Sequence, residues 1–170
     1  LRMPRSLLAF FAGAGLALAG ANLQMITRNP LADPYLFGIS SGASFGVVIA
    51  MTLLGGALGF VLPIAAFAGS LLAIVLLLLI AGLNRTQQVE SMLLAGVALS
   101  FLFSAFTSLM LYWSDPQAVT AILFWTLGSF ARADWQNIWL PLTMVIICFS
   151  LMLIFQRHLS ALLLGDESAT

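Results

Sequence analysis

The run from Pro34 to Asn84 contains no Asp, Glu, Lys or Arg, and no other feature limits the possible folds so strongly. One helix needs roughly 20 apolar residues to cross about 30 Å of hydrocarbon. The run is therefore far longer than one span requires, and we expect the chain to turn near Gly55, Gly56 and Pro63. The composition agrees, because 62% of residues are hydrophobic, 7% are charged and the mean hydropathy is +1.10. A soluble domain would carry about a quarter charged residues.

The apolar runs predict an all-α, polytopic transmembrane bundle of about five spans, with membrane lipid as its surroundings. Between the fourth and fifth spans, residues 114–137 carry several charges together with Trp125 and Trp135. Tryptophan favours the headgroup level of a bilayer, so this segment is predicted to be interfacial with one short helix. The five expected spans cover residues 6–26, 36–54, 61–83, 92–112 and 138–155.

Several function classes are disfavoured by the residues that are present. The formal net charge of zero argues against nucleic-acid binding, which needs clustered basic side chains. The single cysteine, Cys148, has no cysteine partner for a disulfide or a metal site. Ser40 lies in a G-x-S-x-G pattern, but His158 is the only histidine and is far along the chain. We therefore expect no catalytic residues, no metal and no cofactor.

Small residues mark a packing face on the second expected span. Gly38, Gly42 and Gly46 recur every four residues, a spacing that lets neighbouring membrane helices approach closely. Ser41 lies beside this ladder and either lines a polar pathway or bonds back to a helix carbonyl. Asp33, which precedes Pro34, suits the start of a helix.

Residues 29–34, Asn-Pro-Leu-Ala-Asp-Pro, are followed by Gly-Ile-Ser-Ser-Gly-Ala at residues 38–43. This sequence resembles the cytoplasmic turn of the FecCD-type permeases, which are the membrane subunits of ABC importers for iron-siderophore, haem and cobalamin. The resemblance implies a ten-span type II ABC importer fold, of which residues 1–170 form part of the transmembrane permease domain. It also implies the bacterial inner membrane, with Leu1 outside, Thr170 inside and the short interfacial helix periplasmic.

The resemblance also implies partners. Leu1 to Arg5 are similar to the Arg-x-Pro-Arg entry of a family span, where the two arginines face a periplasmic or lipoprotein substrate-binding protein. That role transfers to Arg2 and Arg5, and a planar guanidinium pairs well with carboxylates. The translocation path of the family lies between two permease subunits, so a homodimer or a paralogous pair is expected.

Gating and energy coupling are implied in the same way. Asn29 and Leu31 match family gate residues by identity, whereas Val89 and Glu90 match by position only. The chain contains no lysine and so no Walker A loop, which means that partner ATPase subunits must bind ATP. Residues 164–170 are similar to the start of the family's coupling helices, where Gly165, Asp166 and Glu167 would meet the ATPase.

The resulting hypothesis is an ATP-driven importer that takes up an iron chelate or cobalamin by alternating access. The alternative is an ion-coupled secondary transporter or exporter. Such a protein normally carries an ionisable residue deep within a span. Here every charge lies within about two turns of an expected span end, which favours the importer.

Overall fold

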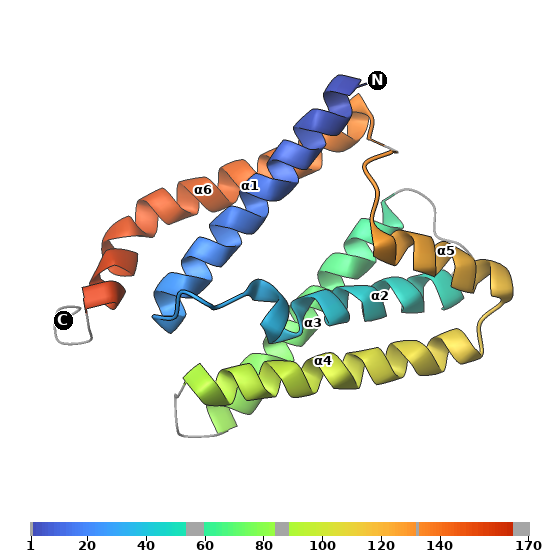
Figure 1. Cartoon of the computed structure of the whole chain (residues 1–170), viewed down its shortest axis with the longest axis horizontal. Coiled ribbons are helices and arrows are strands. Elements are labelled where there is room, and N and C mark those ends of the chain that lie inside the picture. The colour runs from blue at the N-terminus through green and yellow to red at the C-terminus, as the bar shows by residue number, and fades with distance from the viewer. Residues whose placement is uncertain (1, 54–59, 84–88, 132, 165–170) are drawn as a thin grey trace. The chain divides into compact units, whose positions relative to one another are not determined.

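The computed structural model describes residues 2–53, 60–83, 89–131 and 133–164, and almost all of these residues are helical. The predicted all-α bundle is confirmed (Figure 1). Within the described residues the elements are α1 (Arg2–Thr27), the 3-10 helix η1 (Pro34–Phe37), α2 (Ile39–Leu53), α3 (Val61–Leu83), α4 (Val89–Tyr112), α5 (Pro116–Leu127) and α6 (Trp135–Leu164).

Four of these helices, α1, α3, α4 and α6, are long and apolar enough to cross a membrane. The short helix expected between the fourth and fifth spans is α5. Pro116 occupies its first turn, where a missing backbone N–H costs nothing, and Gly128 ends it at φ 71°.

The second expected span differs from its prediction. Residues 36–54 were expected to form one continuous span, but within the described residues α2 covers only Ile39–Leu53. Pro34 instead opens η1, and Gly38 separates the two helices with φ +75°. Glycine adopts this left-handed conformation at little steric cost, so the backbone changes direction here although the apolar pattern continues.

The chain divides into two compact units, each described by itself. The α2–α5 unit covers Pro34–Gly128, and the α1–α6 unit joins Leu1–Asp33 to Ser129–Thr170.

In the α2–α5 unit, α2 is the central element, because it packs against α3, α4 and α5. Val47 and Val48 of α2 are fully buried. The ring of Phe45 lies 5.4 Å from that of Phe103 and 6.0 Å from that of Phe106, measured between centroids, so aromatic contacts join α2 to α4.

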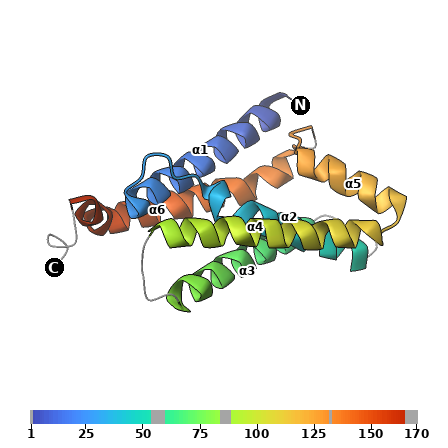
Figure 2. The same cartoon turned by 60° about the horizontal axis from the view of Figure 1, so that its bottom comes forward.

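In the α1–α6 unit, α1 and α6 lie side by side and run in the same direction (Figures 1 and 2). Few of their side chains are buried, although the two helices pack along each other. Pro4 is the only buried residue of α1, and a Cβ built on Gly15 would lie 3.6 Å from the Val145 side chain, an ordinary van der Waals distance. Most apolar side chains of this pair are left for lipid or for other protein surfaces to cover.

Candidate functional site

The turn after α1 is the best-defined structure among the predicted site residues. The Asn29 backbone N–H donates to the Gln24 carbonyl at 3.3 Å, and the Arg28 N–H donates to the Met25 carbonyl at 3.4 Å. These two bonds, with Arg28 at φ 50°, form a Schellman motif that satisfies the last carbonyls of the helix. Pro30 follows and cannot continue the helix.

Asn29 holds the next part of this turn with its side chain. Its Oδ1 accepts a hydrogen bond from the Leu31 backbone N–H at 2.9 Å, and its carbonyl accepts one from the Ala32 N–H at 3.1 Å. Ala32 is buried, whereas the Leu31 side chain is 83% exposed. Asn29 therefore fixes the backbone that presents Leu31 outward.

The other two predicted gate residues, Val89 and Glu90, form the first turn of α4. They belong to the α2–α5 unit, whereas Asn29 and Leu31 belong to the α1–α6 unit. The structure describes the backbone of Val89 and Glu90 and the full side chains of Asn29 and Leu31.

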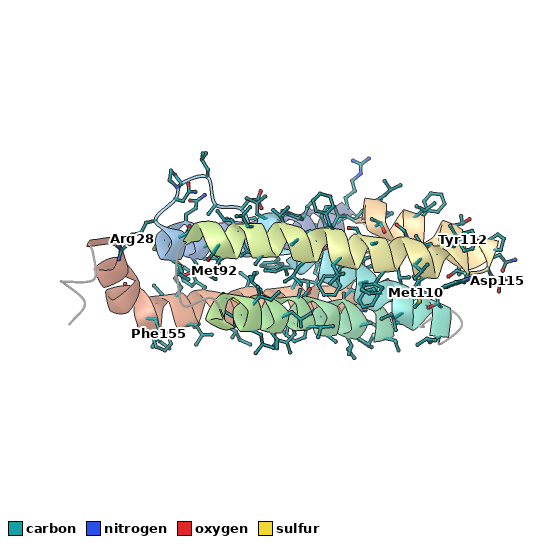
Figure 3. All side chains as sticks on the ribbon, turned by 90° about the horizontal axis from the view of Figure 1, so that it is seen from below. Arg28, Met92, Met110, Tyr112, Asp115 and Phe155 are labelled. Atoms are coloured by element: carbon teal, nitrogen blue, oxygen red, sulfur yellow. The ribbon has the colours of Figure 1, made fainter. Side chains whose placement is uncertain are left out.

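A pocket of about 590 Å³ opens beside the turn. Gln24, Arg28 and Asn29 give it three polar side chains, and Figure 3 labels Arg28 at this end of α1. The remaining lining is apolar and comes from α1, from Pro30 and from α6; it comprises Ala21, Met25, Pro30 and Met152. Sequence reasoning missed this pocket, because nothing in the pattern paired the end of α1 with α6.

Arg2 and Arg5, the predicted docking residues, lie in the first turn of α1, at the opposite end of that helix. Both side chains are exposed. The Arg5 guanidinium donates to the Ala131 carbonyl at 3.1 Å and so ties this end of α1 to the segment that precedes α6. Because a guanidinium has five N–H donors, this bond leaves donor capacity for a partner.

The predicted glycine ladder divides between two neighbours. Gly42 and Gly46 lie on α2 against α3, where a Cβ on Gly42 would come within 2.6 Å of the Gly69 carbonyl oxygen. Gly38, expected as the first rung, precedes α2 and faces α4, with the Gly96 carbonyl 3.1 Å from a built Cβ. Only two of the three glycines therefore share one helix face.

Polar groups near the ladder bond to backbone. The Ser41 hydroxyl donates to the Gly38 carbonyl at 2.9 Å, a bond of the back-bonding kind that the sequence analysis considered. Ser70 of α3 donates to the Ile39 carbonyl at 3.3 Å and links α3 to α2. Sequence reasoning missed Ser70 and Gly69, although the spacing of Ala65, Gly69 and Ala73 could have marked the partner face on α3.

The predicted coupling residues Gly165, Asp166 and Glu167 lie outside the described residues. In the part of the chain that the structure describes, no three His, Cys, Asp or Glu side chains gather into a possible metal site. The acidic residue Asp115 follows the end of α4, close to Tyr112 (Figure 3). Tyr112 makes an edge contact with Trp113, a pairing suited to a membrane interface.

Comparison with solved structures supports the fold. The chain matches a structure described as the inward-facing conformation of a transporter assigned to the metal-chelate type of ABC transporters. The TM-score is 0.87 at 35% sequence identity, and the match covers 99% of this chain and 53% of the other. This likeness supports the type II importer fold that the family resemblance implied.

Two named relatives are similar over nearly the whole sequence. The chain is 40% identical over 169 residues to the Fe(3+) dicitrate transport system permease protein FecD of Escherichia coli K12, covering 99% of this chain and 52% of that protein. It is 37% identical over 171 residues to the vitamin B12 import system permease protein BtuC of Klebsiella pneumoniae, covering 99% and 50%. The chain thus spans about half the length of the curated relatives it matches.

Comparison with protein families agrees with these two relatives. Residues 1–170 match the model of the FecCD transport family. The motif resemblance at residues 29–43 and the helical bundle agree with this match. The chain therefore belongs to the FecCD transport family.

Proposed function

We propose that this chain is part of the membrane permease of an ATP-driven ABC importer in the bacterial inner membrane, which takes up an iron chelate or cobalamin by alternating access. The observation that carries the proposal is the match to the FecCD transport family over all 170 residues. Two relatives support it, because one is named as a permease for ferric dicitrate and the other as a permease for vitamin B12. Four long apolar helices supply the membrane-crossing framework.

The proposed partners are ATPase subunits inside, a substrate-binding protein outside and a second permease subunit. A loaded binding protein would dock at Arg2 and Arg5, and ATP would act through Gly165, Asp166 and Glu167. Each partner must prefer one of two conformations of the permease, because a ligand that binds both states equally shifts neither. Asn29 and Leu31, with Val89 and Glu90, would close the inner end of the path.

Reconstituting the complete transporter in liposomes tests the proposal. Binding protein loaded with a ferric siderophore, haem or cobalamin should stimulate ATP hydrolysis and drive uptake of the same chelate. Uptake that continues without ATP and follows a proton or sodium gradient would overturn the proposal in favour of an ion-coupled transporter.

The docking role predicts a specific loss. Replacing Arg2 and Arg5 by Gln should weaken binding-protein affinity by at least about tenfold per arginine, because each charge-assisted hydrogen bond is worth about 1.5–3 kcal/mol. Copurification with the ATPase should persist, since these residues lie at the other end of α1 from the Asn29 turn. Unchanged affinity for the loaded binding protein would exclude this docking site.

The gate role is tested through the turn itself. In Asn29→Ala the Leu31 N–H loses its 2.9 Å acceptor, so Leu31 is no longer held and chelate should leak into liposomes without ATP. Asn29→Asp keeps an oxygen acceptor and should leak less than Asn29→Ala. Equal leak in the wild type and in Asn29→Ala would remove Asn29 from the gate.

A further inference from the structure

The pocket beside the α1 turn is polar on one side and apolar on the other, and the proposed import function gives a role to Asn29 alone among its lining residues. Its polar lining residues, Gln24, Arg28 and Asn29, lie within the last turn of α1 and just after it, while Ala21, Met25 and Met152 form an apolar wall. The apolar residues come from both α1 and α6, which pack together within one unit. The result is an amphipathic cavity at the end of a membrane-crossing helix.

Arg28 occupies a backbone position that glycine would adopt with less strain. At φ 50° it is a non-glycine residue in left-handed geometry, at the site after a helix where glycine is usual. When a fold keeps a residue in a strained backbone conformation, the side chain of that residue is a candidate for a functional role. That side chain lines the pocket, so the strain and the cavity point to the same residue.

The depth of the pocket favours a lipid. A 26-residue apolar helix is long enough to cross the hydrocarbon, which puts Arg28, just past its end, at the level of the headgroups. A guanidinium can donate to two phosphate oxygens while it keeps another partner, because it has five donors. Basic pockets between membrane helices on the cytoplasmic side bind anionic headgroups. Free phosphate would make no use of the apolar wall.

We propose that this pocket binds one anionic phospholipid of the inner leaflet, with its phosphate on Arg28 and Gln24 and an acyl chain along Ala21, Met25 and Met152. The choice of leaflet rests on the proposed importer orientation. The chemistry of the site, a phosphate diester joined to an apolar chain, does not depend on which substrate the importer carries.

The test uses the complete permease with its partner subunits, purified in detergent and mixed with phosphatidylglycerol or phosphatidylcholine before native mass spectrometry. The wild type should retain phosphatidylglycerol in preference. Arg28→Gly should lower that preference about fivefold, the effect of one basic side chain at an anionic surface. Its unfolding temperature should stay the same or rise, because glycine relieves the φ 50° strain.

Two further variants separate the parts of the site. Ala21→Leu fills the apolar wall and keeps the charge, so it should reduce retention of phosphatidylglycerol while Arg28 is intact. Arg5→Gln removes an equal charge at the other end of α1 and should change the lipid preference less than twofold. Excess inorganic phosphate should not displace the bound lipid.

Three results would overturn the proposal. They are an unchanged lipid preference in Arg28→Gly, an unchanged retention in Ala21→Leu, and displacement of the lipid by inorganic phosphate, which would indicate a phosphate site. The assay contains no chelate and no nucleotide. A failure of the import function therefore leaves the lipid result readable, and the reverse also holds.

Discussion

The α2–α5 unit and the α1–α6 unit use small residues in different ways. In the first, a Cβ built on Gly69 would collide with the Gly42 carbonyl, so the α2 and α3 backbones are in direct contact. In the second, a Cβ built on Gly13 or Gly20 would meet nothing within 4 Å. Glycines within apolar helices thus permit direct backbone contact at Gly42 and Gly69, whereas Gly13 and Gly20 face open space.

This difference separates the packed framework from the candidate functional residues. The α2–α5 unit contains most of the buried side chains, including Val47, Val48, Ala73 and Phe103. The α1–α6 unit contains Arg5 at one end of α1 and the Asn29 turn with its pocket at the other. Residues proposed to meet partners therefore concentrate where few of the described side chains are buried.

The largest expected effect comes from adding a methyl group where α2 and α3 are in contact. Gly69→Ala places a methyl group against backbone that cannot move aside as a flexible side chain would, and should cost about 3 kcal/mol in the free energy of unfolding. Reversible unfolding in mixed detergent micelles measures it. Gly82→Ala on the same helix is the matched control, because a Cβ there meets nothing within 4 Å. Equal stability of the two variants would contradict the close contact.

A smaller effect of opposite sign is expected at Thr107 of α4. Among the described residues, its hydroxyl oxygen is buried without a hydrogen-bond partner. Thr107→Val keeps the shape and removes the unpaired group, so the free energy of unfolding should rise by about 1 kcal/mol. Thr52→Val, whose hydroxyl bonds to the Val48 carbonyl at 2.8 Å, should bring no such gain. A loss of stability in Thr107→Val would mean that the hydroxyl finds a partner in the assembled transporter.

The hydrogen bond from Ser70 to α2 allows a test of the same α2–α3 contact with a smaller expected effect. Ser70→Ala removes the donor to the Ile39 carbonyl at 3.3 Å, and interhelical hydrogen bonds in membranes average about 0.6 kcal/mol. The stability loss should be of that size in the same unfolding assay. Ser108→Ala, which removes a bond within α4 to the Ser104 carbonyl, is the comparison variant. A loss no greater than that of Ser108→Ala would show that Ser70 does not join α3 to α2.

The smallest effect sharpens the contrast between the units. Gly13→Ala replaces glycine within α1 at a site with open space, so helix propensity alone should raise stability by about 0.5 kcal/mol. The measurement is the same unfolding assay on the complete permease. A clear destabilisation would reveal that another protein surface packs on this face of α1, making the two units alike.

Much of the fold was predictable from the sequence, because hydrophobic length and charge placement report directly on membrane crossing. Four long helices lie close to the runs expected at 6–26, 61–83, 92–112 and 138–155. The start of α2 was not predictable in this way. Hydropathy carries no information about backbone direction. Gly38 lies between η1 and α2, and the polarity of the sequence does not change there.

The candidate site was less accessible to sequence reasoning. A spacing of four identified the packing face of Gly42 and Gly46, but a pattern within one helix cannot say which other helix it meets. The bond from Arg5 to Ala131 joins residues 126 positions apart, and the pocket joins Arg28 to Met152. Such pairs depend on tertiary packing, for which one sequence carries no local signal.

The break in the helix at Gly38, before α2, also has a consequence for the bilayer. At 15 residues α2 extends about 22 Å, less than the roughly 30 Å of hydrocarbon. On its amino-terminal side the chain is η1, and Gly96 of α4 comes so close that a Cβ there would strike the Leu36 carbonyl and the Phe37 Cα. Neighbouring protein thus shields backbone that lipid could not solvate. A change of backbone direction at Gly38 is therefore compatible with a position within the hydrocarbon.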